Sequence, residues 1–531
     1  MIRTSFACAA AVTIAGTLSF ILPGFGQEES DQRLGTVHFE TSCNEAAQRR
    51  FDRAMRYQHS FWYRESKELF EEVLKADPSC GIAYWGIALS LLNNPHAPPP
   101  AGNLPQGLAA IEKGKSVGAK TQRERDFIDS LAAFYTDYDK VDHRTRVLAY
   151  LKAIEAVAGR YPNDDEAQIL YGITLNVAAS PNDKTYAMQL KGAAILEPIF
   201  RRQPRHPGVA HYLIHLFDTP PLAEKGLDAA RRYSEIAPAA PHAQHMPSHI
   251  FTRVGYWKES ISSNTVSARF AKEGKEYHDQ LHAMDYLVYA YLQTGQDAKA
   301  RAVVDEIVGV SGFTETFLAG PYAIAASPAR YAMERGEWNR AAELQVRPSP
   351  LAFVPAMTHF ARAVGAARVG KVEAAKADIA KLVELRDKLL AARDAYWAEQ
   401  VDIQRQVASV FVLAAEGKHE EALKALSAAA DAEDKTEKHP VTPGVPIPAR
   451  ELYGTMLLDR GLAKEALAAF EATLKKEPNR LGATLGAAKA AERAGDRAKA
   501  RQHYAAAVAL TENADPVRPE VAEARAFVAR N

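Results

Sequence analysis

Residues 461–504 read GLAKEALAAFEATLKKEPNRLGATLGAAKAAERAGDRAKARQHY, and they carry a repeat that predicts the fold. One set of residue classes recurs after 34 residues: Gly461, Ala466 and Phe470 are followed by Gly495, Ala500 and Tyr504. Glycine accommodates a tight turn between two helices, and alanine lets the two helices approach closely. The aromatic ring fills the space beneath the next pair. This period therefore predicts stacked pairs of antiparallel helices.

The same frame extends over most of the chain. Residues 47–80 match it through Ala54, Tyr57, Phe70 and Pro78. Looser copies follow at Gly255, Gly295/Ala300, Gly336/Ala341, Gly370/Ala375 and Gly417/Ala422. Pairs of helices in such arrays bury their faces only against neighbouring pairs. We therefore expect an all-α, tetratricopeptide-like superhelix, which is an α-solenoid.

Composition divides the chain into four segments. Residues 1–26 contain Arg3 followed by an apolar run, which predicts a secretory signal peptide, with an uncleaved anchor as the alternative. Residues 27–430 form the larger part of the expected superhelix, 431–449 a proline-rich connector, and 450–531 the last repeats. Prolines make the connector stiff and extended, so we expect it to pack across the solenoid's concave face. The protein is expected in the periplasm or outside the cell.

Charge balance and cysteine content narrow the possible partners and compartments. Lysine plus arginine and aspartate plus glutamate each number 65, so no net field attracts nucleic acid or an anionic membrane. After the first 26 residues no stretch is apolar enough to span a bilayer. Two cysteines, Cys43 and Cys80, remain beyond the expected signal peptide. An oxidising compartment permits a bond between them, and the sequence favours neither the bonded nor the free form.

Histidines concentrate in one part of the chain. Eight of the 16 lie between residues 206 and 282, and three pairs share a spacing of four residues: His211/His215, His245/His249 and His278/His282. That spacing places two imidazoles on the same face of a helix. Equivalent helices of consecutive repeats lie side by side in a solenoid. The three pairs are therefore candidates to line one groove.

Imidazole is the commonest side-chain metal ligand, and an all-imidazole set suits zinc or copper more than magnesium or calcium. We expect a metal ion at His211, His215, His245 and His249, with Asp218 as a further ligand or as the group that orients an imidazole. The segment HYLIH lacks the glutamate of HExxH metalloproteases, which argues against that class. A metal-free pocket for a small molecule or peptide and purely structural histidines are the alternatives.

Other residues are candidates for ligand binding around these four. His242, His278 and His282 are expected to surround them, and His59 and His439 are weaker candidates. An aromatic run such as the one after His59 is typical of packing. The polar groups near His439 fit either a loop tip that reaches the groove or a capped helix start, and we favour the second. Met246 is expected outside the helical region, because it precedes Pro247.

Several segments carry a resemblance to a known group. They are HFETSC (38–43), HPGVAHYLIHLFD (206–218), APHAQHMPSHIFTRVGYW (240–257), YHDQLHAMDYLVYAYLQTG (277–295) and KHPVTPGVPIPARELYG (438–454). Together they resemble a group of bacterial exported tetratricopeptide-repeat proteins marked by HYxIH and HMPSHI. The segment NNPHAPP (93–99) departs from that group, in which an aromatic residue follows NP. The resemblance implies a helical superhelix and export, and it implies no reaction.

Two functional hypotheses follow from these observations. The first is an exported repeat protein whose histidine-lined site, within residues 211–282, binds a metal ion or a small ligand. If that site is catalytic, metal-assisted oxidation or hydrolysis is the expected reaction class. The second is an interaction scaffold whose concave groove binds a peptide or an envelope protein. The sequence identifies no catalytic residue and no substrate.

Overall fold

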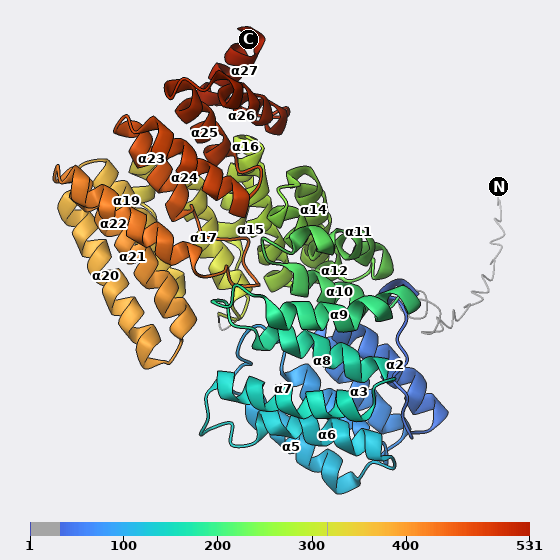
Figure 1. The fold of residues 1–531 in the computed structure, drawn as a ribbon. Helices are drawn as coiled ribbons and strands as arrows, with labels where there is room; N and C mark the ends of the chain where they lie inside the picture. Colours follow the sequence, from blue (N-terminus) through green and yellow to red (C-terminus); the bar gives the residue numbers. More distant parts are fainter. Residues whose placement is uncertain (2–31, 316, 531) are drawn as a thin grey trace.

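The computed structural model describes Met1, residues 32–315 and residues 317–530 (Figure 1). The predicted signal peptide, residues 1–26, lies outside the described residues except for Met1. The described part is built from helices and contains no β-strand, which confirms the all-α prediction. Across these residues, no helix combines the length and the apolar character that a membrane crossing requires.

The helices follow one another as antiparallel neighbours along a curved path (Figure 1). The short 3-10 helix η1 spans Gln32–Leu34. The first third of the chain then forms α2 (Glu45–His59), α3 (Tyr63–Ala76), α4 (Ile82–Leu91), α5 (Asn103–Val117), α6 (Gln122–Tyr135), α7 (His143–Arg160), α8 (Asp165–Ala178) and α9 (Ala187–Arg202). Consecutive helices pack together here, and the first repeat begins with the α2–α3 hairpin.

The middle of the chain carries most of the histidines. It forms α10 (Pro207–Phe217), η2 (Ala223–Gly226), α11 (Leu227–Ile236), α12 (Pro241–His245), α13 (Pro247–Arg253), α14 (Trp257–Gly274), α15 (Tyr277–Gln293) and α16 (Asp297–Gly309). Helices α10, α12, α13 and α15 are the first helices of their pairs. They contact one another, because α10 packs on α13 and α12 on α15. The histidine-bearing helices are therefore neighbours in space.

The remaining helices complete the superhelix. They are α17 (Ala319–Glu334), α18 (Trp338–Ala342), α19 (Phe353–Arg368), α20 (Val372–Ala391), α21 (Ala395–Ala415), α22 (His419–Asp434), α23 (Ala449–Asp459), α24 (Ala463–Lys476), α25 (Leu481–Arg493), α26 (Arg497–Leu510) and α27 (Pro519–Arg530). The last repeats turn back towards the middle of the chain. Trp257 Nε1 donates to the carbonyl of Asn479 at 2.7 Å, and Arg518 forms a buried ion pair with Asp297.

Turn and packing residues confirm the repeat frame. The seven turn glycines all have left-handed φ angles between 63° and 81°: Gly255, Gly295, Gly336, Gly370, Gly417, Gly461 and Gly495. The aromatic residues fill the predicted space, because the rings of Phe70 and Phe470 occupy the positions that a Cβ would take at Gly86 and Gly486. A side chain at either of these glycines would separate the helices.

Met246 departs from the sequence prediction. Its φ of −54° and ψ of −35° are helical, so α12 and α13 continue one another with Met246 between them. The expectation that a residue before proline leaves the helical region was wrong at this position. The preference is steric and modest, and Met246 is completely buried here. His245 therefore ends one short helix, and His249 lies in the first turn of the next.

The proline-rich connector packs against the inner side of the curve. Helix α22 extends to Asp434, so the non-helical segment comprises residues 435–448. We call these residues the connector. Its Gly444 carbonyl accepts hydrogen bonds from Tyr322 at 2.9 Å and from Arg330 at 2.8 Å. Its Glu437 pairs with Lys184 at 2.6 Å. Figure 1 shows the connector near the centre of the molecule, between α17 and α9.

The structure also resolves the pairing of the two cysteines. Cys43 and Cys80 form a disulfide with their Cα atoms 5.2 Å apart. The bond ties the segment before α2 to the turn between α3 and α4. It thereby fastens the N-terminal segment onto the first helical repeat.

Candidate metal centre

Six buried histidines from α10, α12, α13 and α15 form two neighbouring groups. His211, His215 and His242 form the first histidine set, and His245, His249 and His282 form the second histidine set. Within each set, one nitrogen of every ring lies within 4.8 Å of the others. The four predicted metal ligands are therefore divided between two sets. His242 and His282, predicted as surrounding residues, complete them.

The first histidine set is centred on His211. Its Nε2 atom lies 3.1 Å from His215 Nε2 and 3.1 Å from His242 Nε2. His211 and His215 lie one turn apart on α10, as the spacing of four predicts, whereas His242 comes from the start of α12. One helix therefore supplies two imidazoles, and the next repeat supplies the third.

The second histidine set repeats this arrangement one repeat further along the chain. His245 Nε2 lies 2.9 Å from His249 Nε2, and the ring centroids of His245 and His282 lie 4.1 Å apart. The two sets adjoin each other, with 6.0 Å between the ring centroids of His215 and His249. Together they form one continuous cluster of imidazoles.

Hydrogen bonds at the outer nitrogens determine how these rings are protonated. His211 Nδ1 donates to the backbone carbonyl of His59 at 2.8 Å. His245 Nδ1 lies 2.6 Å from Asn264 Oδ1. Because Asn264 uses its amide nitrogen to donate to Ser260 O, its oxygen accepts from His245. His249 Nδ1 donates to Asp218 Oδ2 at 2.9 Å. In their neutral forms, all three rings therefore direct an unprotonated Nε2 inward.

The geometry of the inner nitrogens fits a cation. Burial lowers the pKa of His245 well below its usual value and that of His249 to about 4, so both rings are neutral at neutral pH. Two nitrogen lone pairs then face each other across 2.9 Å without a hydrogen between them. Two nitrogens bound tetrahedrally at zinc distances lie about 3.3 Å apart. The observed separations of 2.9–3.1 Å are close to that value.

Asp218 orients His249 and belongs to a buried charge network. Arg253 Nε donates to its Oδ1 at 2.8 Å, and Lys438 Nζ lies 2.8 Å from its Oδ2. Burial opposes ionisation of this carboxyl, but Lys438 and Arg253 lower its pKa. Burial in turn lowers the pKa of Lys438 to about 8. Of the two roles predicted for Asp218, the structure favours the orientation of an imidazole.

His59 supports the first histidine set through its backbone. Its Nε2 lies 3.0 Å from Glu166 Oε2, and its Nδ1 accepts from the Tyr212 hydroxyl at 3.0 Å. Glu166 also pairs with His206 at 2.9 Å. Although burial favours its protonated form, the two imidazoles lower the pKa of Glu166. Because both ring nitrogens of His59 are already occupied, we assign it to positioning the carbonyl that holds His211.

Two further predicted residues lie outside both histidine sets. The ring of His278 packs against Phe313 and Phe317, one helical turn before His282. His439 accepts from the Val441 N–H at 3.2 Å, and its ring stacks on Trp397.

The interpretation of the residues near His439 as a capped helix start was wrong. Pro448 at the N-cap of α23 offers no side-chain hydrogen bond, whereas Lys438 reaches into the site and pairs with Asp218. The connector is therefore a loop that contributes a charge to the centre.

Besides Lys438 and Arg253, sequence reasoning missed a histidine and a tyrosine at this centre. The ring centroid of His96 lies 4.5 Å from that of His215, and its buried Nε2 has no hydrogen-bond partner among the described residues. Tyr286 places its hydroxyl 3.3 Å from His249 Nδ1. His96 lies more than a hundred residues before the histidine-rich segment, inside the proline-rich loop NNPHAPP. A histidine in place of the aromatic residue that follows NP in the resembled group was the available signal.

Comparisons with known proteins identify no family for this chain. No family model and no curated protein matches it. Among solved structures, a human IFIT1 dimer with m7Gppp-AAAA shares 12% identity over 81% of this chain and 90% of that chain, with a TM-score of 0.36. Yeast Tom70 shares 12% over 92% and 95%, with a TM-score of 0.34. The APC/C hetero-tetramer Cut9-Hcn1 shares 11% over 91% and 95%, with a TM-score of 0.30. These similarities are too low to carry an argument about the function of this chain.

Proposed function

We propose that this protein is an exported, tetratricopeptide-like metalloprotein in which each histidine set binds one zinc or copper ion. The observation that carries the proposal is the contact between His245 Nε2 and His249 Nε2 at 2.9 Å. Both rings donate through Nδ1, to Asn264 and to Asp218, so neither Nε2 carries the hydrogen that would make this contact favourable. A cation between the two lone pairs removes the repulsion.

Ligand chemistry supports zinc or copper. All six ligands are imidazoles, and no carboxylate oxygen belongs to either set. Imidazole sets favour zinc and copper over magnesium and calcium. Because the ligands are neutral, a bound divalent ion keeps its full charge and supplies Lewis acidity or, for copper, electron transfer. Asp218 strengthens the donor character of His249 by accepting its Nδ1 proton.

Export is supported by three features. Residues 1–26 have the pattern of a signal peptide, and the resemblance of the HYLIH and HMPSHI segments is to exported bacterial repeat proteins. The disulfide between Cys43 and Cys80 suits an oxidising compartment. We assign the protein to that group and to the periplasm or the extracellular space on these grounds.

The scaffold hypothesis would require a protein-binding surface away from the histidine cluster. All six histidines of the two sets are buried, with at most 8% of their surface exposed. A peptide that lay along the inner side of the curve would meet the connector before it reached them. The histidine cluster therefore favours the metal centre, and a protein partner would have to bind elsewhere on the solenoid.

Elemental analysis of the purified full chain tests the proposal. After loading with zinc or with copper and removal of excess metal, we expect one ion per histidine set. Replacing His211 and His215 by alanine is expected to remove one ion, and replacing His245 and His249 the other. The exposed His419→Ala variant is the control and should retain both. Absence of stoichiometric metal from the folded wild-type protein would contradict the proposal, and capture of a partner unaffected by either double replacement would favour a scaffold.

A further inference from the structure

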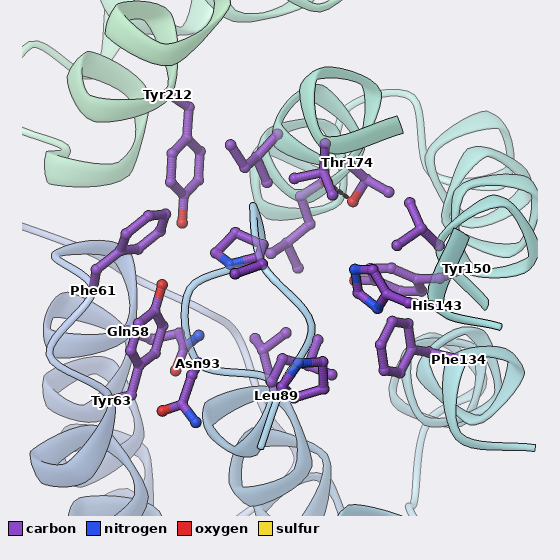
Figure 2. Close-up of a pocket in the computed structure, with 18 residues that line it drawn as sticks. Gln58, Phe61, Tyr63, Leu89, Asn93, Phe134, His143, Tyr150, Thr174 and Tyr212 are labelled. Atoms are coloured by element: carbon purple, nitrogen blue, oxygen red, sulfur yellow. Dashed lines mark hydrogen bonds between the residues drawn. The ribbon is translucent and has the colours of Figure 1, made fainter. Parts of the chain in front are cut away.

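A second feature of the molecule lies beside the first histidine set. It is a cavity of about 70 Å³ between α2, α3, α4, α6, α7, α8 and α10, covered by the loop after α4 (Figure 2). Its lining is mostly apolar and includes Leu89, Phe134, Val147, Leu170, Ile173 and Val177. The space holds roughly five water-sized spheres, which is room for a small ring or a short chain.

The cavity suits an uncharged guest. No aspartate, glutamate, lysine or arginine lines it. Its one imidazole, His143, is neutral at neutral pH because burial lowers its pKa to about 4. An ion placed there would lose its hydration without gaining a counter-charge, which is costly in an apolar site. A neutral organic molecule would instead exchange water for apolar contacts.

Polar atoms at two sides of the cavity lack partners. The Tyr63 hydroxyl and His143 Nδ1 are buried and make no hydrogen bond with any described residue. Figure 2 shows Tyr63 beside Gln58 on one side and His143 beside Tyr150 on the other. A buried polar atom without a hydrogen-bond partner destabilises the folded state. A guest with a hydroxyl or carbonyl group would satisfy at least one of them.

Phe61 connects this cavity to the first histidine set. Its ring lines the cavity and lies 4.3 Å from His211, 5.6 Å from His215 and 5.2 Å from His242, measured between ring centroids. One aromatic ring therefore forms a wall that the cavity and the histidines share. A guest that presses on Phe61 presses on all three imidazoles.

The backbone of Phe61 carries strain that supports a functional role. In the repeat frame, Phe61 stands nine residues before Phe70, as Gly461 stands nine before Phe470. It has a φ of 57°, in the left-handed region that the equivalent glycines adopt. A residue with a side chain is strained in that conformation. The first repeat tolerates this strain and thereby places an aromatic ring against the histidines.

We propose that this cavity binds a small, uncharged, mainly apolar organic molecule that carries a hydroxyl or carbonyl group, and that Phe61 couples its occupancy to the first histidine set. Binding in the cavity stands on the cavity alone, and the coupling rests on the proposed metal centre. The covering loop is a second connection between the cavity and the first histidine set. It lines the cavity with Asn93, Pro95, Ala97 and Pro99, and its His96 packs against His215.

Calorimetric titration of the metal-free full chain with 4-methylphenol tests the cavity. We expect saturable binding of one molecule per chain and none for benzoate, which has a similar size and a charge. Ala97→Phe places a ring into the cavity and should weaken 4-methylphenol binding about tenfold or more. Ala101→Phe, at an exposed position of the same loop, is the matched control and should leave the affinity unchanged. Ile173→Phe fills the cavity from α8 instead of from the loop. It should weaken binding as well, which would show that the effect of Ala97→Phe does not come from a displaced loop.

Addition of 4-methylphenol to the copper-loaded protein tests the coupling. We expect the copper absorption spectrum to shift in the wild type and in Ala101→Phe, and not in Ala97→Phe. Phe61→Gly keeps the turn, removes the shared ring and should abolish the shift. The inference would be overturned if the wild type showed no saturable binding. It would also be overturned if Ala97→Phe and Ile173→Phe both bound 4-methylphenol as tightly as the wild type. If the protein bound 4-methylphenol saturably but took up no metal, the proposed binding in the cavity would stand. The coupling and the proposed function would both be overturned.

Discussion

Lys438 Nζ lies 2.8 Å from Asp218 Oδ2, which joins the connector to the end of α10. Both side chains are almost completely buried, with 7% and 3% of their surface exposed. The same carboxylate accepts from His249 and from Arg253. The charge that orients one imidazole of the second histidine set is therefore held from two directions, by Arg253 of α13 and by a loop far along the sequence.

Asp218→Asn is expected to lower both the free energy of unfolding and the metal affinity of the second histidine set. The substitution removes the nearest carboxylate from buried Lys438 and Arg253 and leaves Glu437, 3.8 Å from Arg253, as the remaining negative charge, which we expect to cost about 3 kcal/mol in the free energy of unfolding. The loss of the carboxylate behind His249 should lower metal affinity at that set about 10- to 100-fold. Urea unfolding and metal titration measure the two effects. Asp228→Asn, an exposed position on α11, is the control, and equal behaviour of the two variants would contradict the assigned role.

Gly208→Ala tests how His59 supports the first histidine set. A Cβ at Gly208 would lie 2.5 Å from His59 Nδ1 and 2.8 Å from its Cγ, and the ring is too enclosed to move freely. We expect a loss of about 1–3 kcal/mol in unfolding free energy and weaker metal binding through the displaced His59 carbonyl. Gly159→Ala on α7 meets nothing within 4 Å and should be neutral or stabilising by up to about 1 kcal/mol. A Gly208→Ala variant as stable as Gly159→Ala would refute this account.

Glu433 should make the stability of the wild-type protein fall as the pH rises above about 5. Burial raises the pKa of its carboxyl from 4.5 to about 7, so between these values the folded state retains a proton that the unfolded state releases. Stability therefore decreases across this window, by about 3 kcal/mol at most. Glu433→Gln keeps the oxygen that accepts from the Ala449 N–H and does not titrate.

Urea unfolding at pH 5 and pH 8 distinguishes the variant from the wild type. We expect Glu433→Gln to be relatively more stable at pH 8 and to lose the contribution that Glu433 makes to the pH dependence. Glu421→Gln, an exposed residue of the same helix, should retain the wild-type dependence. Parallel pH profiles for all three proteins would show that Glu433 does not titrate in this window.

Removal of the disulfide should destabilise the first repeat. The bond closes a loop with a sequence separation of 37 residues, for which the chain-entropy model gives about 4 kcal/mol. The hydrogen bond from Asn44 N–H to Asp77 at 2.9 Å still holds the segment, so the measured loss should not exceed this value. We expect Cys43→Ser with Cys80→Ser to unfold at lower urea, and a reductant to lower the wild-type midpoint only. A reductant without effect on the wild type would contradict the prediction.

Local rules made the repeat predictable. The glycine, alanine and aromatic positions act within one hairpin or between neighbours, so their spacing in the sequence carries the geometry of Gly461, Ala466 and Phe470 directly. The spacing of four in His211/His215 likewise predicted two imidazoles on one face. These features depend on helical periodicity, which is visible in any single helix.

The division into two histidine sets was not predictable in the same way. His278 and His282 share a face of α15, and only the axial position of that helix relative to α12 places His282, and not His278, at the second set. The packing of α15 against α12 determines this offset, and no periodicity encodes it. His96 and Lys438 escaped prediction for a related reason, because both come from proline-rich loops whose paths depend on tertiary packing.

The connector supplies a charge to the histidine cluster from far along the chain. All six imidazoles of the cluster are present once the chain has reached residue 282, but the ammonium group that neutralises Asp218 belongs to residue 438. A truncated polypeptide that ends before the connector possesses every ligand and still leaves that carboxylate without its second cationic partner. On the proposed metal binding, full retention of the second ion would therefore require the connector as well as the imidazoles.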